Sequence, residues 1–464
     1  MARKRSVVPV RATVEEFAGV DLGDKRLDRR AEAIVEKLSK RPSASFPKLM
    51  VTSKEQEALY RFLRNDRVTL KGLIEPHILA TALRAEDWDL VVVAHDSTEI
   101  AFRGESRNDM YELRKGTYGF GVHLSLAIGV GQSHPCPLGT LGATIHPDTK
   151  SDRDRWLSQA LEVEQRLGVS CNRIHVMDRE ADVYPLLAGL IENNARFVVR
   201  AHHDRLLGGE QKGTTILGEL QRNGDVVASR EVFISARRAS AKSSMPDERK
   251  ARPPRNSRVA QLRIRTCTVT VPRPPRQDKK QPASIDINIV EAAEVKAPKG
   301  TEPVHWLLAT TEPIDTAEQA LKVIDIYRTR WVIEEYFKAL KTGCKYETRQ
   351  LEQLQTFSAA LGLFIPIAWQ LLLIRSHARI AGVPASTVIT DNRLHVLRVL
   401  CAKNDHQIPK VPTARDVMQA IALLGGHIRQ NGEPGWIVLW RGYETVLDAE
   451  YAIEAAKEFA KRLA

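Results

Sequence analysis

Cysteine is scarce in this sequence, and the cysteines it has are far apart. Only five occur among the 464 residues, namely Cys136, Cys171, Cys267, Cys344 and Cys401. Zinc modules pair their cysteines at spacings such as CxxC, and disulfide frameworks use an even number of cysteines. We therefore expect neither kind of site, and the pattern favours a protein of a reducing cytoplasm.

Long apolar segments are also nearly absent. The N-terminal stretch MARKRSVVPVRATVEEF is basic and lacks the apolar core of a signal peptide. One run, Phe357–Ile374, resembles a membrane span, but it contains Ser358, Pro366 and Gln370. Because a span usually needs about 20 predominantly apolar residues, we expect a buried core or interface helix there and no association with a membrane.

Acidic residues are outnumbered by basic ones. Lys and Arg number 69 against 57 Asp and Glu, which gives a formal net charge of +12. This balance favours a polyanionic partner, although clustering of charge says more than its sum. No internal repeat or coiled-coil pattern is present, and the length predicts two to four domains.

The first part of the chain is predicted to be helical. Asp21–Arg30 leads into the helix-prone Ala31–Lys40, Ser53–Gln56 has the pattern of a capping box, and a third helical stretch covers Leu70–Arg84. Short helices that carry arginines suit a small DNA-reading module. They also suit ordinary solvated helix surfaces, and both interpretations stay open at this point.

From Asp89 onward the pattern becomes that of an α/β protein. The expected strands are 90–95, 123–130, 141–146, 173–178 and 196–200, and the expected helices are 152–167 and 179–191. Strands followed by alternating helix and strand predict a mixed sheet with helices packed on it.

A different composition follows between residues 201 and 302. Three β-like runs, 226–234, 259–271 and 285–295, predict a β-rich insertion. Between the first two lies Arg237–Arg258, which is too polar and proline-rich to fold alone. This basic loop suits a solvated tether and a phosphate-contacting segment equally well.

The chain then returns to α/β and ends in helices. A strand is expected at 305–310 and a long helix from Ala317 to about Lys341. The last ninety or so residues look helical and finish in an amphipathic segment, Val446–Ala464.

Two aspartates stand at the predicted strand ends. Asp96 follows the apolar run 90–95, and Asp178 ends the run 173–178. Functional groups gather at the carboxyl ends of strands in α/β sheets. One such aspartate is weak evidence, but two on neighbouring strands, joined by a third carboxylate, would form a site for hard divalent cations.

The third carboxylate is predicted on the long helix. At about 100° per residue, Tyr327, Arg330, Glu334 and Lys341 fall within about 60° of arc, whereas Glu335 lies about 80° away from Tyr327. The apolar residues of the same helix, Ile326, Ile333, Phe337 and Leu340, form an adjacent stripe that we expect to be buried. The geometry therefore selects Glu334 rather than Glu335.

These residues carry a resemblance to a known family. The spacing Tyr327-x2-Arg330-x3-Glu334-x6-Lys341 resembles the signature of the hairpin-forming DDE transposases of bacterial insertion sequences, the Tyr-Arg-Glu-Lys (YREK) group. The segments DST at Asp96 and DREAD at Asp178, and the N- and C-terminal stretches Gln56–Asn65 and Leu423–Glu444, are similar too. The resemblance covers nearly the whole chain.

The resemblance implies a fold and its domains. It implies an RNase H-like α/β catalytic core interrupted by a β-rich insertion and flanked by helical regions. The implied domains are a DNA-binding domain (1–72), the first part of the core (73–200), the insertion (201–302), the second part of the core (303–375) and a C-terminal dimerisation region (376–464).

It also implies the roles of individual residues. Asp96, Asp178 and Glu334 would be the catalytic residues and would bind two Mg²⁺ ions, which Mn²⁺ could replace. Tyr327, Arg330 and Lys341 would hold DNA phosphates, for which Arg and Lys are suited. Trp306 would stack on a base flipped out of the duplex, and Arg200 would make a further phosphate contact. Asp182, one helical turn beyond Asp178, is expected to support the site rather than bind metal.

The implied activity is cut-and-paste transposition. The enzyme would bind the terminal inverted repeats, nick them, form and open a hairpin, and join the 3′ ends to target DNA, as a homodimer on double-stranded DNA in the bacterial cytoplasm, at the nucleoid. Two alternatives remain, namely an RNase H-like nuclease without strand transfer and an inactive DNA-binding inhibitor of transposition.

Overall fold

The fold is given by a computed structural model with side chains. It describes residues 7–463 except 11, 104–108, 115, 132–133, 147–152, 235, 237–254, 404–405, 429 and 431. The basic loop expected at Arg237–Arg258 therefore lies, up to residue 254, outside the described residues. Contacts divide the chain into two compact units. Unit 1 comprises Met1–Asp152, Ser158–Arg173 and Thr329–Ala464, and unit 2 comprises Arg153–Leu157 and Ile174–Arg328.

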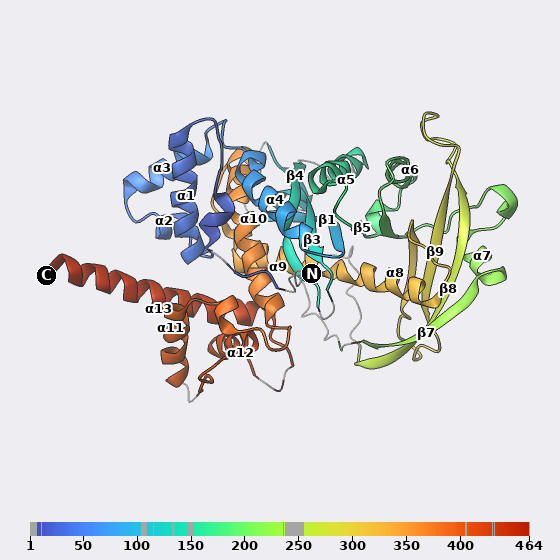
Figure 1. Ribbon diagram of the computed structural model, residues 1–464. Coiled ribbons are helices and arrows are strands. Elements are labelled where there is room, and N and C mark those ends of the chain that lie inside the picture. The colour runs from blue at the N-terminus through green and yellow to red at the C-terminus, as the bar shows by residue number, and fades with distance from the viewer. Residues whose placement is uncertain are drawn as a thin grey trace. The chain divides into compact units, whose positions relative to one another are not determined.

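Unit 1 begins with helices (Figure 1). The three predicted stretches form α1 (Lys25–Lys40), α3 (Ser53–Leu63) and α4 (Leu70–Glu86), and two short helices that were not predicted, η1 (Thr13–Phe17) and α2 (Phe46–Leu49), lie before α1 and α3. The Asp24 side chain caps α1 by accepting a hydrogen bond from the backbone N–H of Arg26. The predicted capping box is displaced by one residue, because Thr52 rather than Ser53 has the extended backbone of an N-cap and exchanges hydrogen bonds with Glu55.

The sheet of unit 1 is antiparallel and consists of β1 (Val91–Arg103), β2 (Tyr111–Arg114), β3 (Thr117–Gly129) and β4 (Cys136–His146). Strand β3 pairs with all three of the others. Strand β1 is longer than predicted, so the expectation that Asp96 stands at a strand end is wrong. Asp96 lies inside β1 opposite Leu124, because the residues after it continue to pair with β3 up to Arg103.

A long apolar helix, α10 (Leu354–His377), forms the centre of unit 1. It is apolar enough to cross a bilayer, but 89% of its most apolar 18-residue window is buried within the protein. It packs against α4 and β4, and the indole N–H of Trp369 donates to the carbonyl of Pro137 on β4 at 3.0 Å. The prediction of a buried core helix at Phe357–Ile374 is confirmed.

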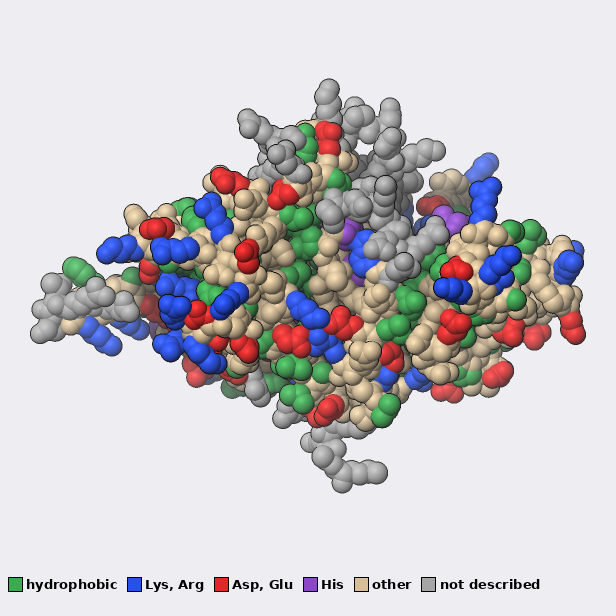
Figure 2. Space-filling view, turned by 90° about the horizontal axis from the view of Figure 1, so that it is seen from above, with side chains coloured by type: hydrophobic (Ala, Val, Ile, Leu, Met, Phe, Trp, Pro, Cys, Tyr) green, Lys and Arg blue, Asp and Glu red, His purple; other side chains and the backbone are tan. Residues whose placement is uncertain are grey.

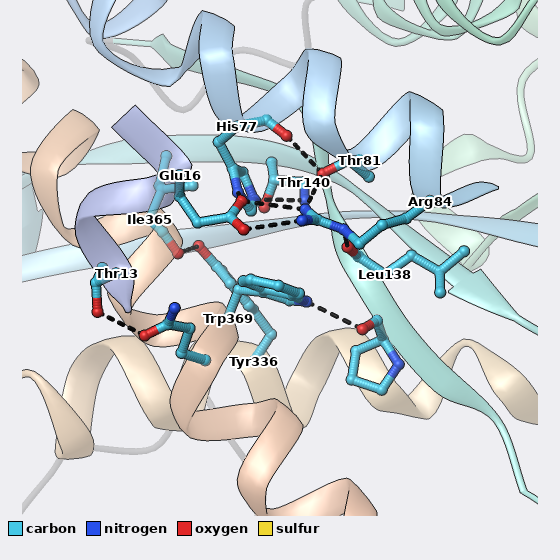
Figure 3. A network of polar contacts seen from close by, with 12 residues as sticks. Thr13, Glu16, His77, Thr81, Arg84, Leu138, Thr140, Tyr336, Ile365 and Trp369 are labelled. Carbon is cyan, nitrogen blue, oxygen red and sulfur yellow. Dashed lines mark hydrogen bonds and ion pairs between the residues drawn. The ribbon is translucent and has the colours of Figure 1, made fainter. Parts of the chain in front are cut away.

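A buried polar network joins these elements of unit 1 (Figure 3). Arg84 on α4 makes two hydrogen bonds to the Glu16 carboxylate on η1, at 2.8 and 3.1 Å, and its guanidinium lies 4.3 Å from the centre of the Trp369 ring. His77 contacts Glu16 through Nδ1 and accepts the backbone N–H of Thr140 on β4 at Nε2. Since Nε2 accepts, His77 is neutral and Arg84 supplies the positive charge that offsets Glu16.

The strands of unit 2 form a mixed sheet. Strand β5 (Arg173–Met177) is parallel to β6 (Phe197–Arg200), and β10 (His305–Thr310), β9 (Ser284–Glu294), β8 (Arg258–Pro272) and β7 (Asp225–Ile234) follow with antiparallel pairing. The three β-like runs predicted between residues 201 and 302 are thus strands. They extend the sheet of β5, β6 and β10 through the pairing of β9 with β10.

The helices of unit 2 are α6 (Tyr184–Glu192), α7 (Ile216–Arg222) and α8 (Ala317–Thr329), and α5 (Arg153–Leu167) begins in unit 2 and belongs to unit 1 from Ser158 onward. Helix α5 agrees with the helix predicted at 152–167, whereas α7 was not predicted. The helix predicted at 179–191 is instead a short turn, η2 (Arg179–Ala181), followed by α6, because Val183 is extended and Pro185 lies in the first turn of α6, where proline is favoured. A further short turn, η3, covers Gly209–Gln211.

The long helix predicted at Ala317–Lys341 is interrupted. α8 ends at Thr329, α9 (Trp331–Lys338) follows after Arg330, and one π-helical turn, η4 (Ala339–Gly343), replaces the last α-helical turn. The predicted apolar stripe of Ile326, Ile333, Phe337 and Leu340 is buried, as expected. Single π-helical turns inside α-helices occur frequently at functional sites, and this one carries Lys341.

The C-terminal part of unit 1 is helical, as predicted. After the turns η5 (Tyr346–Thr348) and η6 (Ala385–Thr387) come α11 (Asp391–Ala402), α12 (Ala414–Leu424) and α13 (Trp436–Leu463). Val446 and Leu447 of α13 pack inside, whereas the described side chains from Tyr451 to Lys461 are exposed. The last turns of α13 extend beyond the other helices of the unit (Figure 1). All five cysteines are free.

Candidate active site

In unit 1, Asp96 is fixed by its own strand and by Arg330. One carboxylate oxygen, Oδ1, accepts the backbone N–H of Ser97 at 2.9 Å. The other, Oδ2, accepts a hydrogen bond from Nη1 of Arg330, also at 2.9 Å. The aspartate side chain is 20% exposed, so Asp96 is held in place and still reaches solvent.

Arg330 links Asp96 to Glu334. Its second terminal nitrogen, Nη2, donates to Oε1 of Glu334 at 2.8 Å, and the arginine side chain is only 6% exposed. Arg330 and Glu334 stand four residues apart across the junction between α8 and α9, which is the spacing at which side chains on a helix meet. Unit 1 therefore brings together two of the predicted carboxylates and one of the predicted phosphate-binding residues.

Lys341 lies against strand β1 instead. Its ammonium group donates to the backbone carbonyl of Glu99 and pairs with Glu347 at 3.4 Å. Glu347 in turn accepts the backbone N–H of Ala101 at 3.1 Å. The helical projection assumed a regular α-helix up to Lys341, and the π-helical turn changes the direction of this side chain.

Unit 2 holds Asp178, Tyr327 and Trp306 together. Asp178 follows β5, as predicted, and its Oδ1 accepts the backbone N–H of Arg179 at 2.8 Å and the hydroxyl of Tyr327 at 3.1 Å. The Tyr327 ring packs edge-on against Trp306, with ring centres 5.4 Å apart. A carboxylate, a phenol and an indole thus form one cluster.

Arg200 ends strand β6 and reaches the strand that bears Trp306. Its Nη2 donates to the backbone carbonyl of His305 at 3.2 Å. This contact places the Arg200 guanidinium beside the residue that precedes Trp306.

Asp182 supports the segment that follows β6. It is 1% exposed and accepts the backbone N–H groups of His202 at 2.6 Å and His203 at 2.9 Å. It also pairs with Arg205 at 2.6 Å. Asp182 thus ties the turn after Asp178 to the chain after Arg200, and its supporting role in the site stays a prediction.

Glu335 points to a different part of unit 1. It is 8% exposed, accepts the indole N–H of Trp436 at 2.5 Å, and pairs with Lys338 at 2.8 Å and with Arg375 at 3.3 Å. Burial raises the pKa of Glu335, but Lys338, Arg375 and Trp436 outweigh it and hold the pKa below its usual range. Glu335 therefore joins α9 to α10 and α13.

Sequence reasoning missed the buried polar side chains behind Asp96. His95 and Ser125 are fully buried opposite each other on β1 and β3, and Gln159 on α5 contacts Ser125. A signal was present, since His123 and Ser125 interrupt an otherwise apolar strand at alternate positions.

The donor chemistry of unit 1 fits a divalent cation. Carboxylate oxygens are the ligands that Mg²⁺ prefers, and Asp96 and Glu334 are close enough to share one guanidinium. Among the described residues, no three His, Cys, Asp or Glu side chains are grouped so as to hold a metal ion. The third predicted ligand, Asp178, belongs to unit 2.

Surface charge is distributed rather than concentrated on the face that Figure 2 shows. Lys and Arg side chains are interspersed there with Asp and Glu. Among the described residues of that face, Lys and Arg therefore do not form a single basic patch.

Two family models match the chain. Residues 11–68 match a family described as transposase DNA-binding, and residues 87–367, more than half of the chain, match the transposase DDE domain. The first range covers η1 to α3, and the second covers Asp96, Asp178 and Glu334. DDE domains have an RNase H-like fold, cleave and transfer DNA strands, and typically use divalent metal ions. The chain belongs to the family of DDE transposases, with a DNA-binding domain ahead of the catalytic one.

Proposed function

We propose that the protein is a cut-and-paste transposase of the hairpin-forming group with the Tyr-Arg-Glu-Lys signature. The observation that carries the proposal is the position of Arg330, which bonds to both Asp96 and Glu334. An arginine that bonds to two carboxylates is suited to release one of them and to bond to a DNA phosphate instead. The Tyr327 hydroxyl donates a hydrogen bond to Asp178 and is likewise suited to exchange that partner for a DNA phosphate.

Asp96, Asp178 and Glu334 are the proposed catalytic residues and the ligands of two Mg²⁺ ions, which Mn²⁺ can replace. The ions supply an activated oxygen nucleophile and stabilise the leaving oxygen of a phosphodiester. The protein's part is to hold the carboxylates. The N–H of Ser97 orients Asp96 and the N–H of Arg179 orients Asp178, while Tyr327 and Arg330 hold Asp178 and Glu334 until DNA binds.

The DNA end is held by the remaining residues of the signature. Arg330, Lys341 and the Tyr327 hydroxyl contact phosphates near the cleavage point, and Arg200 contacts another. Trp306 stacks on a base that leaves the duplex as the hairpin forms. Its edge-on contact with Tyr327 fixes the ring beside Asp178, and base stacking on an aromatic ring is worth about 1–3 kcal/mol.

One set of residues can serve all four steps of the reaction, because each step is the same displacement with a different nucleophile. Water nicks the element end, the freed 3′-hydroxyl attacks the opposite strand to form a hairpin, water opens the hairpin, and the 3′ end then attacks target DNA.

The proposed domains keep the predicted limits. Residues 1–72 bind the terminal inverted repeats, 73–200 and 303–375 form the RNase H-like core, and 201–302 form an insertion built of β7, β8 and β9. Residues 376–464, which include α13, make the homodimer. The protein acts on chromosomal DNA in the bacterial cytoplasm.

The test is a cleavage assay on a duplex that carries the inverted repeats flanking the gene, with products resolved on a denaturing gel. The proposal expects a nick, then a hairpin, then strand transfer, all dependent on Mg²⁺ or Mn²⁺. Cleavage without a hairpin or a joined product would instead indicate the RNase H-like nuclease, and end binding without cleavage would indicate an inhibitor.

A further inference from the structure

A chain of hydrogen bonds crosses unit 1 behind Asp96. Thr144 Oγ1 on β4 donates to Gln159 Oε1 on α5 at 3.1 Å, and Gln159 Nε2 donates to Ser125 Oγ on β3 at 2.5 Å. Ser125 Oγ lies 2.9 Å from Nδ1 of His95 on β1. His95 is the residue directly before Asp96.

The backbone carbonyl of Gly142 fixes the orientation of the Gln159 amide group. Gln159 Nε2 also faces the backbone carbonyl of Gly142 at 3.5 Å, and only the amide NH₂ end can face a carbonyl. Ser125 Oγ therefore accepts a hydrogen bond from Gln159 and shares a second one with Nδ1 of His95. Gly142 leaves room for this arrangement, because a Cβ there would meet the Gln159 side chain at 3.3 Å.

A second pair lies beside the first. Ser97 Oγ contacts Nδ1 of His123 at 3.1 Å, and the His95 and His123 rings stack with centres 5.9 Å apart. The two pairs, His95–Ser125 and Ser97–His123, are cross-strand neighbours on either side of the pair Asp96–Leu124. Because side chains alternate along a strand, the two pairs lie on the face opposite Asp96.

The stability of the fold does not by itself explain why polar side chains are buried at these positions. His95, Ser125 and Gln159 are 0%, 0% and 3% exposed, and well-packed apolar side chains in such places are often as stable as a buried polar network. What the polar pairs add is specificity. The run Val91–Ala94 is apolar and would tolerate a shift by two residues, whereas both polar pairs form only in the observed register.

We infer that the chain Thr144–Gln159–Ser125–His95 is a positioning network that sets the register of β1 and thereby holds the Asp96 carboxylate where it binds metal. The inference rests on the proposed role of Asp96 as a metal ligand. These residues touch neither the DNA nor the ion. They act through the strand, as residues outside a metal's own ligands do when they orient a ligand.

The test uses two variants of the full-length protein, Ser125→Ala and Gln159→Leu, which remove different members of the hydrogen-bond network. Thr81→Ala is the control, because it removes a fully buried hydroxyl of the same unit that bonds to the His77 carbonyl. Mn²⁺ binding is followed by electron paramagnetic resonance, together with Mg²⁺-dependent cleavage, end binding and thermal unfolding.

Both variants should weaken Mn²⁺ binding about tenfold and raise the Mg²⁺ concentration for half-maximal cleavage by a similar factor, the loss typical of altered residues that orient metal ligands. End binding should be unchanged, and the Thr81→Ala protein should lose similar stability but bind Mn²⁺ normally. Mn²⁺ affinity within twofold of wild type in folded Ser125→Ala and Gln159→Leu proteins would overturn the inference.

Asp96→Asn separates this failure from failure of the proposed function. If wild type binds Mn²⁺ no better than Asp96→Asn, the metal role of Asp96 falls, and the inference falls with it. If binding depends on Asp96 but not on Ser125 or Gln159, only the positioning network is refuted.

Discussion

Glu334 and Glu335 are neighbours on α9, yet their carboxylates bond to different residues. Glu334 accepts a hydrogen bond from Arg330, which also holds Asp96. Glu335 is buried against Trp436 and Arg375, in the C-terminal helical part of unit 1. One peptide bond thus separates a proposed catalytic carboxylate from a structural one.

Substituting the two glutamates should give opposite results. Glu334→Ala should abolish cleavage with little loss of stability, since its side chain is 29% exposed and Arg330 keeps its bond to Asp96. Glu335→Ala should destabilise the protein by about 3 kcal/mol, because it leaves Arg375 buried without its carboxylate. Single-turnover cleavage and urea unfolding of both proteins measure the two effects.

Glu335→Gln serves as the matched variant. It keeps an acceptor for Trp436 and should fold better than Glu335→Ala while cleaving DNA whenever it is folded. Loss of cleavage in a folded Glu335→Gln protein, or retained cleavage in Glu334→Ala, would reverse the assignment of the two residues.

The hydroxyl of Tyr327 should matter more than its ring. Tyr327→Phe removes the 3.1 Å hydrogen bond to Asp178 and keeps the packing against Trp306. A hydrogen bond to a charged group is worth about 1.5–3 kcal/mol, so single-turnover cleavage of bound DNA ends should slow roughly ten- to a hundredfold. If the Tyr327→Phe protein cleaves at the wild-type rate, the Tyr327 hydroxyl is not needed for catalysis.

Divalent metal should compensate for the loss of Arg330. Without Mg²⁺, Arg330→Gln leaves Asp96 and Glu334 without their shared guanidinium, and the melting temperature should fall. Added Mg²⁺ should raise it more than in wild type, where the ion must displace Arg330 before binding both carboxylates. Arg328→Gln, which removes a half-exposed pair with Asp325, is the control. Equal Mg²⁺ shifts in Arg330→Gln and wild type would show that the guanidinium and the ion do not compete.

The network around Glu16 should stabilise the protein in a pH-dependent way. Burial raises the pKa of Glu16, but the hydrogen bond with His77 and the bonds and charge of Arg84 outweigh it and lower the pKa from 4.5 to about 2. Because the folded pKa is depressed, the stabilisation is complete above about pH 4.5 and is lost as the pH falls towards 2.

Glu16→Gln should therefore lose on the order of 3 kcal/mol at pH 7, and the difference from wild type should narrow below pH 4.5. Urea unfolding between pH 7 and pH 3 measures this. Glu57→Gln, whose pair with Arg61 is exposed, should cost less than about 1 kcal/mol at any pH. A gap between Glu16→Gln and wild type that stays constant with pH would contradict the assigned charge.

Local patterns in the sequence predicted most of the secondary structure. Asp178 was found because an apolar run ends at Met177, and the burial of Ile333 and Phe337 follows from helical periodicity. The extension of β1 beyond Asp96 was not predictable, because Ser97–Glu99 look like loop residues until β3 pairs with them. Tertiary pairing overrides local propensity there.

Contacts distant in the chain were beyond sequence reasoning. Nothing near Glu335 indicates that Trp436 would bond to it. The π-helical turn at Ala339–Gly343 has no clear local signal and redirects Lys341 towards Glu99. Likewise, the runs between residues 201 and 302 were predicted as strands, but no local pattern shows which strand they join. They join the sheet through the pairing of β9 with β10.

The proposed function depends above all on Asp96, Asp178 and Glu334 binding the same metal ions. Iron(II) bound in place of Mg²⁺ generates hydroxyl radicals with ascorbate and peroxide, and these cut the polypeptide next to the ion. The protein bound to its DNA ends should be cut near all three residues, in β1, after β5 and in α9, and excess Mg²⁺ should suppress every cut. Cuts near Asp96 and Glu334 with none near Asp178 would contradict the claim.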